Sequence, residues 1–257
     1  MVLTPGARSD RASPRLWRRE DDRRTSVWTE AAGTPPSVYG EPLSAADGRT
    51  IRRWDPTRSK LAAAILNRWE GPIPRPGERW LYLGAASGTT ASHVADLVAS
   101  TGCVYAIEKS PRSFVRLLAL ARRYPNLAPI LADARHPELY LGLVPPVDGL
   151  YADIAQSDQV EISIANQELF LRDGGSLLLA LKTASMGRER SAADHLARAE
   201  GLLEPSVVLE SPARLEPFHR QHYLLGGRTK DRAGHARPAA APTITRKGSG
   251  SRAAPRR

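Results

Sequence analysis

Residues 81–93, LYLGAASGTTASH, decide the fold class of this chain. An apolar run ends at Gly84, a loop of Gly, Ala and Ser follows, and Thr89 and Thr90 can open a helix. A strand, a glycine-containing turn and a helix in succession bring the backbone close to a ligand that lies above the turn. The stretch therefore predicts one unit of an α/β sheet with a ligand site at its end.

Apolar runs alternate with segments of helical character throughout the part of the chain after Pro76. The apolar runs cover residues 80–84, 103–108, 128–133, 148–153 and 176–182, and the helical segments cover 90–99, 111–123 and 159–171. Strands that alternate with helices form parallel βαβ units with right-handed crossovers. We predict an α/β fold with a doubly wound, mostly parallel, seven-stranded sheet, closed at one edge by a hairpin from SVVLES and HYLLGG.

Composition divides the chain into three parts. Residues 1–50 predict a small β-rich N-terminal appendage with a basic, partly disordered start. Residues 51–227 form the main domain. It contains the helix-forming run SKLAAAILNRW, with Ser59 as its N-cap, followed by the alternating pattern. Residues 228–257 are rich in Pro, Ala, Gly, Ser and Arg and predict a basic disordered tail.

The formal net charge of +10 is concentrated at the two ends of the chain. Residues 1–24 carry a net +3 and residues 228–257 a net +8, whereas residues 25–227 hold 21 basic and 22 acidic side chains. Nucleic-acid binding needs clustered basic side chains, which this body as a whole lacks. One local cluster spans residues 49–79, and the pattern leaves open whether it is a solvated face or an RNA contact. Its basic members are Arg49, Arg52, Arg53, Arg58, Lys60, Arg68, Arg75 and Arg79.

Several classes of protein are disfavoured by the sequence. The longest apolar runs fall far short of the roughly 20 residues that span a bilayer, and the N-terminus has no apolar signal segment. Cys103 is the single cysteine, so we expect no disulfide and no cysteine-rich zinc site, and we predict no metal ligands. We expect a protein that is not secreted and that works in the cytoplasm.

Each predicted parallel strand ends in a residue suited to ligand contact. In a sheet of this kind, ligands bind at the carboxyl ends of the strands. An acid 24 residues beyond Gly84 can accept both hydroxyls of a ribose, in either a nicotinamide-cofactor site or an S-adenosylmethionine site. The turn lacks the G-x-G-x-x-G spacing, and a further acid follows the next strand, which favours S-adenosylmethionine. The five strand-end residues are Gly84, Glu108, Asp133, Asp153 and Lys182.

Asp153 and Lys182 form a second, chemically distinct pair of strand ends. A lysine that closes an apolar strand is partly desolvated, and a nearby carboxylate directs its ammonium group. Such a pair suits the handling of a hydroxyl proton, with Lys182 assisting deprotonation and Asp153 orienting it. An ordinary ion pair is the alternative.

Six segments of the chain resemble the fibrillarin family, specifically the archaeal fibrillarin-like rRNA/tRNA 2′-O-methyltransferases. The resemblance spans residues 37–225, and YLGAASGTTASHV is its most specific block. It implies the S-adenosylmethionine-dependent methyltransferase type of sheet. The N-terminal residues are not the Gly-Arg-rich kind of eukaryotic nucleolar fibrillarins, which favours the archaeal group. The segments are VYGEPL (38–43), RRWDPTRSKLAAAIL (52–66), LYLGAASGTTASHVADLV (81–98), IEKSPRS (107–113), PILADARHPELY (129–140) and YADIAQSDQ (151–159).

The resemblance also implies site residues. Lys60, Asp153, Lys182 and His222 fall on the family's catalytic set, with His219 as a competitor for the histidine position. The cofactor contacts that it implies are Gly84, Thr89, Thr90, Glu108, Lys109, Asp133, Ala134, Asp153, Ile154, Ala155 and Gln156.

Three positions depart from the family pattern. Lys109 stands where the family often has Phe, Ala184 where it usually has Arg, and Gln221 where it commonly has an acid. These departures affect the surroundings of the site.

The family works with partners, and the resemblance implies the same ones here: a box C/D guide RNA, target rRNA or tRNA, a Nop-domain scaffold protein and a kink-turn-binding ribosomal protein. The predicted function is guided methylation of the ribose 2′-hydroxyl. The alternative is a structural subunit of the ribonucleoprotein particle that binds S-adenosylmethionine without efficient turnover. A nicotinamide-dependent dehydrogenase is a third reading, based on the shared sheet alone.

Overall fold

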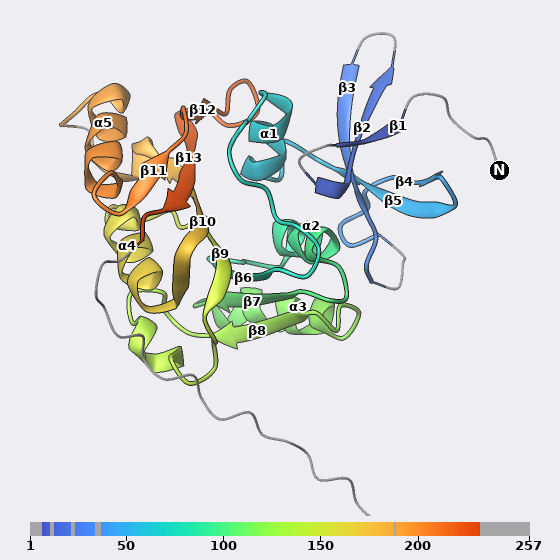
Figure 1. The fold of residues 1–257 in the computed structure, drawn as a ribbon, viewed down its shortest axis with the longest axis horizontal. Helices are drawn as coiled ribbons and strands as arrows, with labels where there is room; N and C mark the ends of the chain where they lie inside the picture. Colours follow the sequence, from blue (N-terminus) through green and yellow to red (C-terminus); the bar gives the residue numbers. More distant parts are fainter. Residues whose placement is uncertain (1–6, 11–12, 22–23, 34–36, 188, 232–257) are drawn as a thin grey trace, which may run out of the picture.

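The computed structural model describes residues 7–10, 13–21, 24–33, 37–187 and 189–231, which form two β-sheets and five α-helices. Figure 1 shows the smaller sheet beside α1 (Lys60–Leu66) and α2 (Thr89–Val98), next to the larger, helix-covered sheet. The tail was predicted to begin at residue 228, but Arg228 and Thr229 belong to the last strand, His222–Thr229. The rest of the predicted tail beyond residue 231, like the first six residues, lies outside the described part of the chain. No described helix is long and apolar enough to cross a membrane.

The smaller sheet is antiparallel and confirms a β-rich N-terminal unit. Its strand order is β1-β2-β3-β5-β4. The boundary predicted at residue 50 falls inside β5, whose later residues pair with β3 up to Trp54. The strands are β1 (Ala7–Asp10), β2 (Ser13–Asp21), β3 (Arg24–Glu30), β4 (Leu43–Ala46) and β5 (Arg49–Trp54).

The larger sheet has the order β11-β13-β10-β9-β6-β7-β8, with a short β12 paired to β13. Strands β10, β9, β6, β7 and β8 run parallel, and β13 joins β10 antiparallel. The predicted doubly wound, mostly parallel sheet is confirmed, including the edge strands, with β12 as an additional strand. The strands are β6 (Arg79–Leu83), β7 (Cys103–Glu108), β8 (Leu127–Leu131), β9 (Val147–Ala152), β10 (Leu171–Lys182), β11 (Val207–Leu209), β12 (Ala213–Arg214) and β13 (His222–Thr229).

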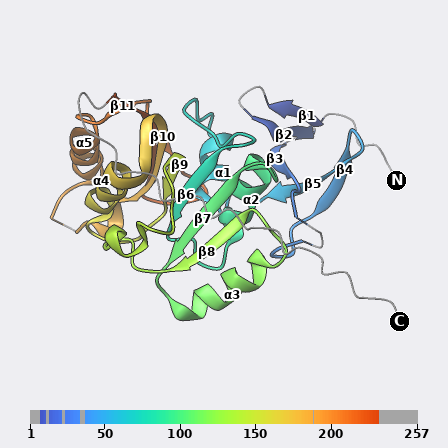
Figure 2. The same cartoon turned by 60° about the horizontal axis from the view of Figure 1, so that its bottom comes forward.

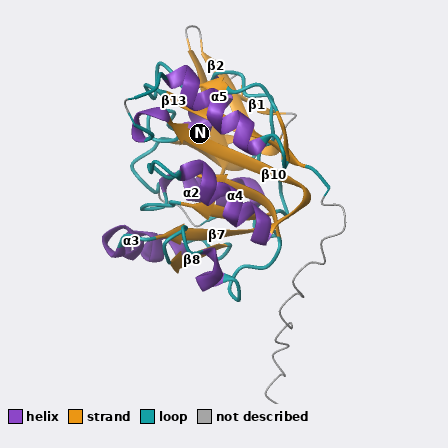
Figure 3. Ribbon diagram, turned by 90° about the vertical axis from the view of Figure 1, so that its left-hand side faces the viewer, coloured by secondary structure: helices purple, strands orange, loops and turns teal. Residues whose placement is uncertain are grey.

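Helices cover both faces of the larger sheet. Side chains alternate between faces along a strand, so Trp80 and Tyr82 pack with α1, α2 and α3 (Pro111–Ala121). Leu81 and Leu83 instead pack with α4 (Gln159–Phe170) and α5 (Ala192–Leu203). Figure 2 shows α3 along β7 and β8, and Figure 3 looks onto the side of α4 and α5. The described residues also form two 3-10 helices, η1 (Pro137–Tyr140) and η2 (Thr183–Ser185).

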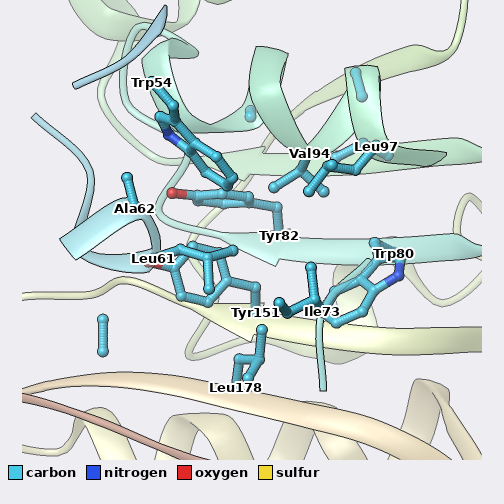
Figure 4. Packing of buried hydrophobic residues seen from close by; sticks show 14 of the residues in the cluster. Trp54, Leu61, Ala62, Ile73, Trp80, Tyr82, Val94, Leu97, Tyr151 and Leu178 are labelled. Carbon is cyan, nitrogen blue, oxygen red and sulfur yellow. The ribbon is translucent and has the colours of Figure 1, made fainter. Parts of the chain in front are cut away.

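The core beneath α1 contains two buried tyrosines from neighbouring strands. Tyr82 and Tyr151 meet edge to face with ring centroids 4.8 Å apart. Figure 4 shows their hydroxyl ends turned toward α1, where Leu61 and Ala62 lie. Helix α1 begins at its predicted cap, because the Ser59 hydroxyl accepts a hydrogen bond from the Ala62 N–H at 3.4 Å. The start of α1 is thereby fixed above the carboxyl ends of the strands.

A buried polar network joins the small sheet to α2. The guanidinium of Arg52 on β5 lies 2.6 Å from Glu41 and 2.8 Å from Asp96 of α2, and all three side chains are almost fully buried. The Thr29 hydroxyl of β3 donates to Asp96 at 2.8 Å and contacts His93 Nδ1 at 2.7 Å. Buried ion pairs that are fully hydrogen-bonded hold two elements in one relative position. The small sheet is therefore fixed to the helix that follows the Gly-rich turn.

Candidate active site

The turn after β6 brings two strand ends into contact. Gly84 has a φ of +78°, and a Cβ at this position would lie 2.5 Å from the carbonyl oxygen of Asp153. The Asp153 N–H in turn donates to the Leu83 carbonyl at 3.0 Å. A side chain at residue 84 would therefore be strained and would collide with the β9 end. Glycine is required here because the backbones at the ends of β6 and β9 lie in direct contact.

A cavity of about 260 Å³ opens beside this turn. It lies at the carboxyl ends of β6, β7, β8 and β9, where a sheet of this kind binds its ligand. Nine of the eleven predicted cofactor residues line it; Thr89 and Thr90 lie instead in the first turn of α2. The lining residues from that set are Gly84, Glu108, Lys109, Asp133, Ala134, Asp153, Ile154, Ala155 and Gln156.

Glu108 is a buried carboxylate held by the backbone. One of its oxygens accepts a hydrogen bond from the Ala86 N–H and the other from the Ser110 N–H, both at 2.7 Å. Each carboxylate oxygen has two acceptor sites, so both keep one for a ligand. Only 8% of the residue is exposed, and it lines the cavity. Glu108 is therefore a rigid acceptor suited to the two hydroxyls of a ribose.

Asp133 lies between two cations at the other end of the cavity. Lys109 and Arg135 each approach its carboxylate at 3.8 Å. Arg135 also donates to Asp158 at 2.8 Å and to the side chain of Gln156. The hydrogen bond from Arg135 lowers the pKa of Asp158 below its ordinary value. Arg135, which sequence reasoning missed, lies in the loop after β8 and thus connects it to the loop after β9 through Asp158 and Gln156.

Lys60 and Asp153 form an ion pair at the carboxyl end of β9. Lys60 Nζ lies 2.6 Å from Asp153 Oδ1, and the two side chains are 22% and 18% exposed. The predicted pairing of Asp153 with Lys182 is not formed, and Asp153 pairs with Lys60 instead. The reason is that the long-range packing of α1 on the sheet brings the first residue of this helix over β9.

Lys182 is the last residue of β10, as predicted, and one side chain forms hydrogen bonds with both its N–H and its carbonyl. Gln159, fully buried at the start of α4, accepts from the Lys182 N–H at 2.9 Å and donates to its carbonyl at 3.1 Å. In the described chain Lys182 forms no ion pair within 4.0 Å. Sequence reasoning gave Gln159 no role in the site, although it is the last residue of the family segment YADIAQSDQ (151–159).

Both candidate histidines lie near the Lys60–Asp153 pair. The His219 and His222 rings are 5.7 Å apart, and His222 pairs with Lys182 in the β10–β13 register. His219 Nε2 contacts the Pro56 carbonyl at 2.8 Å, and His222 Nδ1 contacts the Arg220 carbonyl at 2.7 Å. Burial, and then the positive charge of Lys60, lowers the pKa of each ring below its ordinary value. At neutral pH, the His219 and His222 side chains near the ion pair are therefore uncharged.

The negative charge of Asp153 also acts on the tyrosines beneath it. Burial, reinforced by this charge, raises the pKa of Tyr82 and of Tyr151 well above the ordinary value. Both phenols therefore remain protonated and uncharged, and they form part of the buried core beside Asp153. Sequence reasoning placed neither tyrosine in the site, because each appears in its strand as an ordinary apolar position.

The side chains that line the cavity have acceptor and apolar groups suited to S-adenosylmethionine. Glu108 suits the ribose hydroxyls, the Asp133 carboxylate suits an exocyclic amino group, and Ile107 and Ile154 offer apolar walls to a base. Gly84 itself lines the cavity, so a ligand bound there would lie directly beside the turn. The Lys60–Asp153 pair adjoins this cavity through Asp153.

Comparison with known proteins decides the family. The family model described as Fibrillarin matches residues 12–231, most of the chain. This chain belongs to the fibrillarin family. The fibrillarin-like rRNA/tRNA 2′-O-methyltransferase of Aeropyrum pernix is 43% identical over 192 residues, which are 73% of this chain and 81% of that protein. The family resemblance predicted from the six segments is thereby confirmed.

Solved fibrillarin structures have the same fold. The crystal structure of Aeropyrum pernix fibrillarin with natively bound S-adenosyl-L-methionine superposes with a TM-score of 0.79 at 37% identity, covering 88% of this chain and 99% of that one. A fibrillarin/Nop5p complex matches with a TM-score of 0.74 at 37% identity, covering 85% of this chain and 98% of that one. The expected type of methyltransferase sheet is thus confirmed.

Proposed function

We propose that this fibrillarin-family chain transfers a methyl group from S-adenosyl-L-methionine to the ribose 2′-hydroxyl of rRNA and tRNA. The observation that carries the proposal is the Lys60–Asp153 ion pair at 2.6 Å, placed beside a cavity whose acceptors suit a nucleoside. Relatives named rRNA/tRNA 2′-O-methyltransferases and a relative with bound S-adenosyl-L-methionine support it.

The residues divide into a binding group and a reacting group. Glu108 holds the ribose of the cofactor and Asp133 its base, while Gly84 admits it close to the turn. S-adenosyl-L-methionine supplies a methyl carbon whose bond to sulfur breaks as the attacking oxygen bonds to it. Orientation is essential for such an in-line transfer, because a ribose hydroxyl is a weak nucleophile.

Asp153 and the two lysines act on the 2′-hydroxyl. Lys60 occupies Oδ1 of Asp153, which leaves Oδ2 to accept the hydroxyl proton as the new carbon–oxygen bond forms. Lys182, at the end of the neighbouring strand, stabilises the negative charge that develops on the oxygen. The histidines, uncharged through burial, add no positive charge that would disturb this pair.

The proposed setting is a box C/D ribonucleoprotein particle in the cytoplasm. A Nop-domain scaffold is the proposed direct partner, supported by the fibrillarin/Nop5p complex of a relative. A guide RNA and a kink-turn-binding ribosomal protein complete the proposal. Because residues 25–227 are close to neutral, base pairing of the guide, rather than readout by this chain, would select the nucleotide.

The test is methyl transfer from labelled S-adenosyl-L-methionine to a guide-complementary RNA in a particle reconstituted with these partners. We expect transfer by the wild type and a loss of about 100-fold or more in Lys182→Ala, because it removes a charge aimed at the reacting oxygen. Lys230→Ala, at the far end of β13, is the matched control and should retain full transfer.

A second result would favour the structural alternative. A wild-type particle that assembles and binds S-adenosyl-L-methionine but transfers no methyl group would identify a subunit that kept the pocket without turnover. Equal losses in Lys182→Ala and Lys230→Ala would instead contradict the role given to Lys182.

A further inference from the structure

The arginine-rich segment 49–79 divides into buried and exposed members. Arg52 is 2% exposed and neutralised by Glu41 and Asp96, and Arg49 pairs with Glu30 at 2.8 Å. Arg58 is exposed, and its guanidinium lies over the ring of Tyr39, 5.2 Å from the centroid. Arg52 therefore stabilises the fold, whereas Arg58 is available at the surface, although both belong to the same basic run of the sequence.

Arg58 lines a cavity of about 420 Å³ that is distinct from the cofactor cavity. Arg116 and Arg123, from α3 and the turn that follows it, line it as well. Neither Arg58 nor Arg116 forms an ion pair within 4.0 Å with a described acidic side chain. Among the described residues, the lining contains three arginines and no acid. The cavity is therefore a site for anionic groups.

The floor of this cavity is rigid. The Tyr39 hydroxyl lies 2.9 Å from His93 Nε2, and His93 Nδ1 contacts the Thr29 hydroxyl, which donates to Asp96. Burial lowers the pKa of His93 well below its ordinary value, so the ring is neutral, and its Nδ1 donates to the Thr29 hydroxyl. The Tyr39 hydroxyl also donates to the Arg53 carbonyl at 3.1 Å. Tyr39 is thus fixed from below, and its exposed face supports Arg58 by a cation–π contact.

One turn separates the two cavities. Gly84 and Ala86 line the cofactor cavity, whereas Ser87 and Thr89 line the arginine cavity. Arg58 precedes Lys60 by two residues, and Lys60 pairs with Asp153. A chain that lies in the arginine cavity would therefore continue, within a few residues, to the ion pair proposed to act on the 2′-hydroxyl.

We propose that Arg58, Arg116 and Arg123 form a binding site for the phosphate backbone of the RNA that carries the target nucleotide. The inference rests on the proposed function and assigns its substrate to a surface. The carboxylate of S-adenosyl-L-methionine is the other anion close by. Its own ammonium and sulfonium groups oppose entry into a cavity with three arginines and no acid, whereas an RNA backbone presents a phosphate at every residue.

The test compares two double variants of the full chain with the same change in charge. Arg58→Gln with Arg116→Gln empties the cavity of two cations. Arg122→Gln with Arg198→Gln removes two exposed arginines, one from the C-cap of α3 and one from α5 on the opposite face. Affinity for two RNA duplexes of unrelated sequence is measured by fluorescence anisotropy across a salt series, and S-adenosyl-L-methionine affinity by calorimetry.

We expect Arg58→Gln with Arg116→Gln to lower the affinity for both RNA duplexes by about tenfold. The slope of log affinity against log salt concentration should decrease by about two, and the control pair should lose much less affinity. S-adenosyl-L-methionine affinity should stay at the wild-type value in both. Equal RNA losses in the two pairs, or a loss confined to S-adenosyl-L-methionine, would overturn the proposal.

The failure of this inference and that of the proposed function are separable. RNA affinity is measured without turnover, so it decides the arginine site even if the particle proves inactive. In an active particle, the cavity pair should raise the KM for RNA more than it lowers kcat. An active particle with unchanged RNA affinity and KM in the cavity pair would overturn the inference and leave the function intact.

Discussion

Lys60 and Asp153, 93 residues apart in the sequence, meet at 2.6 Å above the buried Tyr82 and Tyr151. The pair joins the first residue of α1 to the residue that follows β9, and Asp153 also lines the cofactor cavity. Cofactor pocket and reacting carboxylate therefore share one residue.

Lys60→Met tests the role of this pair. We expect methyl transfer by the reconstituted particle to fall by about 100-fold, because Asp153 loses the charge that fixes its orientation. S-adenosyl-L-methionine affinity should change little, since Lys60 does not line the cofactor cavity. Steady-state transfer assays with a parallel calorimetric titration check both parts. Methyl transfer that survives in Lys60→Met but is lost in Lys182→Ala would contradict the role given to Lys60. It would indicate that Lys182, as the sequence predicted, is the lysine that acts with Asp153.

Gly84→Ala tests the contact between the ends of β6 and β9. Its Cβ would lie 2.5 Å from the Asp153 carbonyl, so the two strand ends must separate. We expect S-adenosyl-L-methionine affinity to fall by more than about tenfold. Gly174→Ala is the matched control, because its φ is +67° but nothing lies within 4 Å of its Cβ. Equal losses of affinity in both variants would show that backbone strain, rather than this contact, is responsible.

Glu108→Gln tests the acceptor held by the Ala86 and Ser110 N–H groups. A Gln amide nitrogen must face one of these donors, so one of the two hydrogen bonds is lost. We expect a stability loss of about 1–3 kcal/mol in urea unfolding, together with weaker S-adenosyl-L-methionine binding. Glu138→Gln, on the exposed η1, should change neither quantity. Unchanged cofactor affinity in Glu108→Gln would argue against ribose binding at this carboxylate.

Arg52→Leu tests the junction between the two sheets. It leaves Glu41 and Asp96 buried without their common cation, so we expect a stability loss of about 3–5 kcal/mol in urea unfolding. Arg49→Leu removes a half-exposed partner of Glu30 and should cost about 1 kcal/mol or less. Similar losses in the two variants would mean that the buried network does not stabilise the junction.

His93 predicts a dependence of stability on pH. Burial lowers its pKa well below the ordinary 6.5. Below pH 6.5, His93 is therefore protonated in the unfolded chain but remains uncharged in the folded chain. The stability that His93 contributes is present above pH 6.5 and is lost as the pH falls toward its folded pKa, by up to about 1.4 kcal/mol per pH unit.

The measurement is urea unfolding at a series of pH values between neutral and the folded pKa of His93. His219 and His222 also have lowered pKa values and add to the wild-type slope, so the informative quantity is the difference from His93→Gln. The variant should show the shallower slope, and the exposed His136→Gln should follow the wild type. A slope in His93→Gln equal to that of the wild type would contradict the prediction.

Local patterns were sufficient for most of the fold. Apolar runs bounded by helical segments located β6 to β9 to within two residues, and Ser59 was recognised as a cap, because periodicity and capping act between near neighbours. The end of β10 was predicted, but its start was placed five residues too late, at residue 176 instead of Leu171. The helix Ala192–Leu203 and the short β12 were not predicted, and the boundary at residue 50 divided β5. That strand is stabilised by pairing with β3 and β4, which no local pattern records.

The sequence by itself determined the strand-end residues Gly84, Glu108, Asp133, Asp153 and Lys182, because the carboxyl end of each parallel strand is read directly from where its apolar run stops. Only the tertiary structure decided how charges pair. Asp153 pairs with Lys60 rather than Lys182, and Arg52 is buried while Arg58 is exposed. Pairing and burial depend on which elements pack together, and the pairs concerned, Arg52–Asp96 and Lys60–Asp153, are 44 and 93 residues apart in the chain.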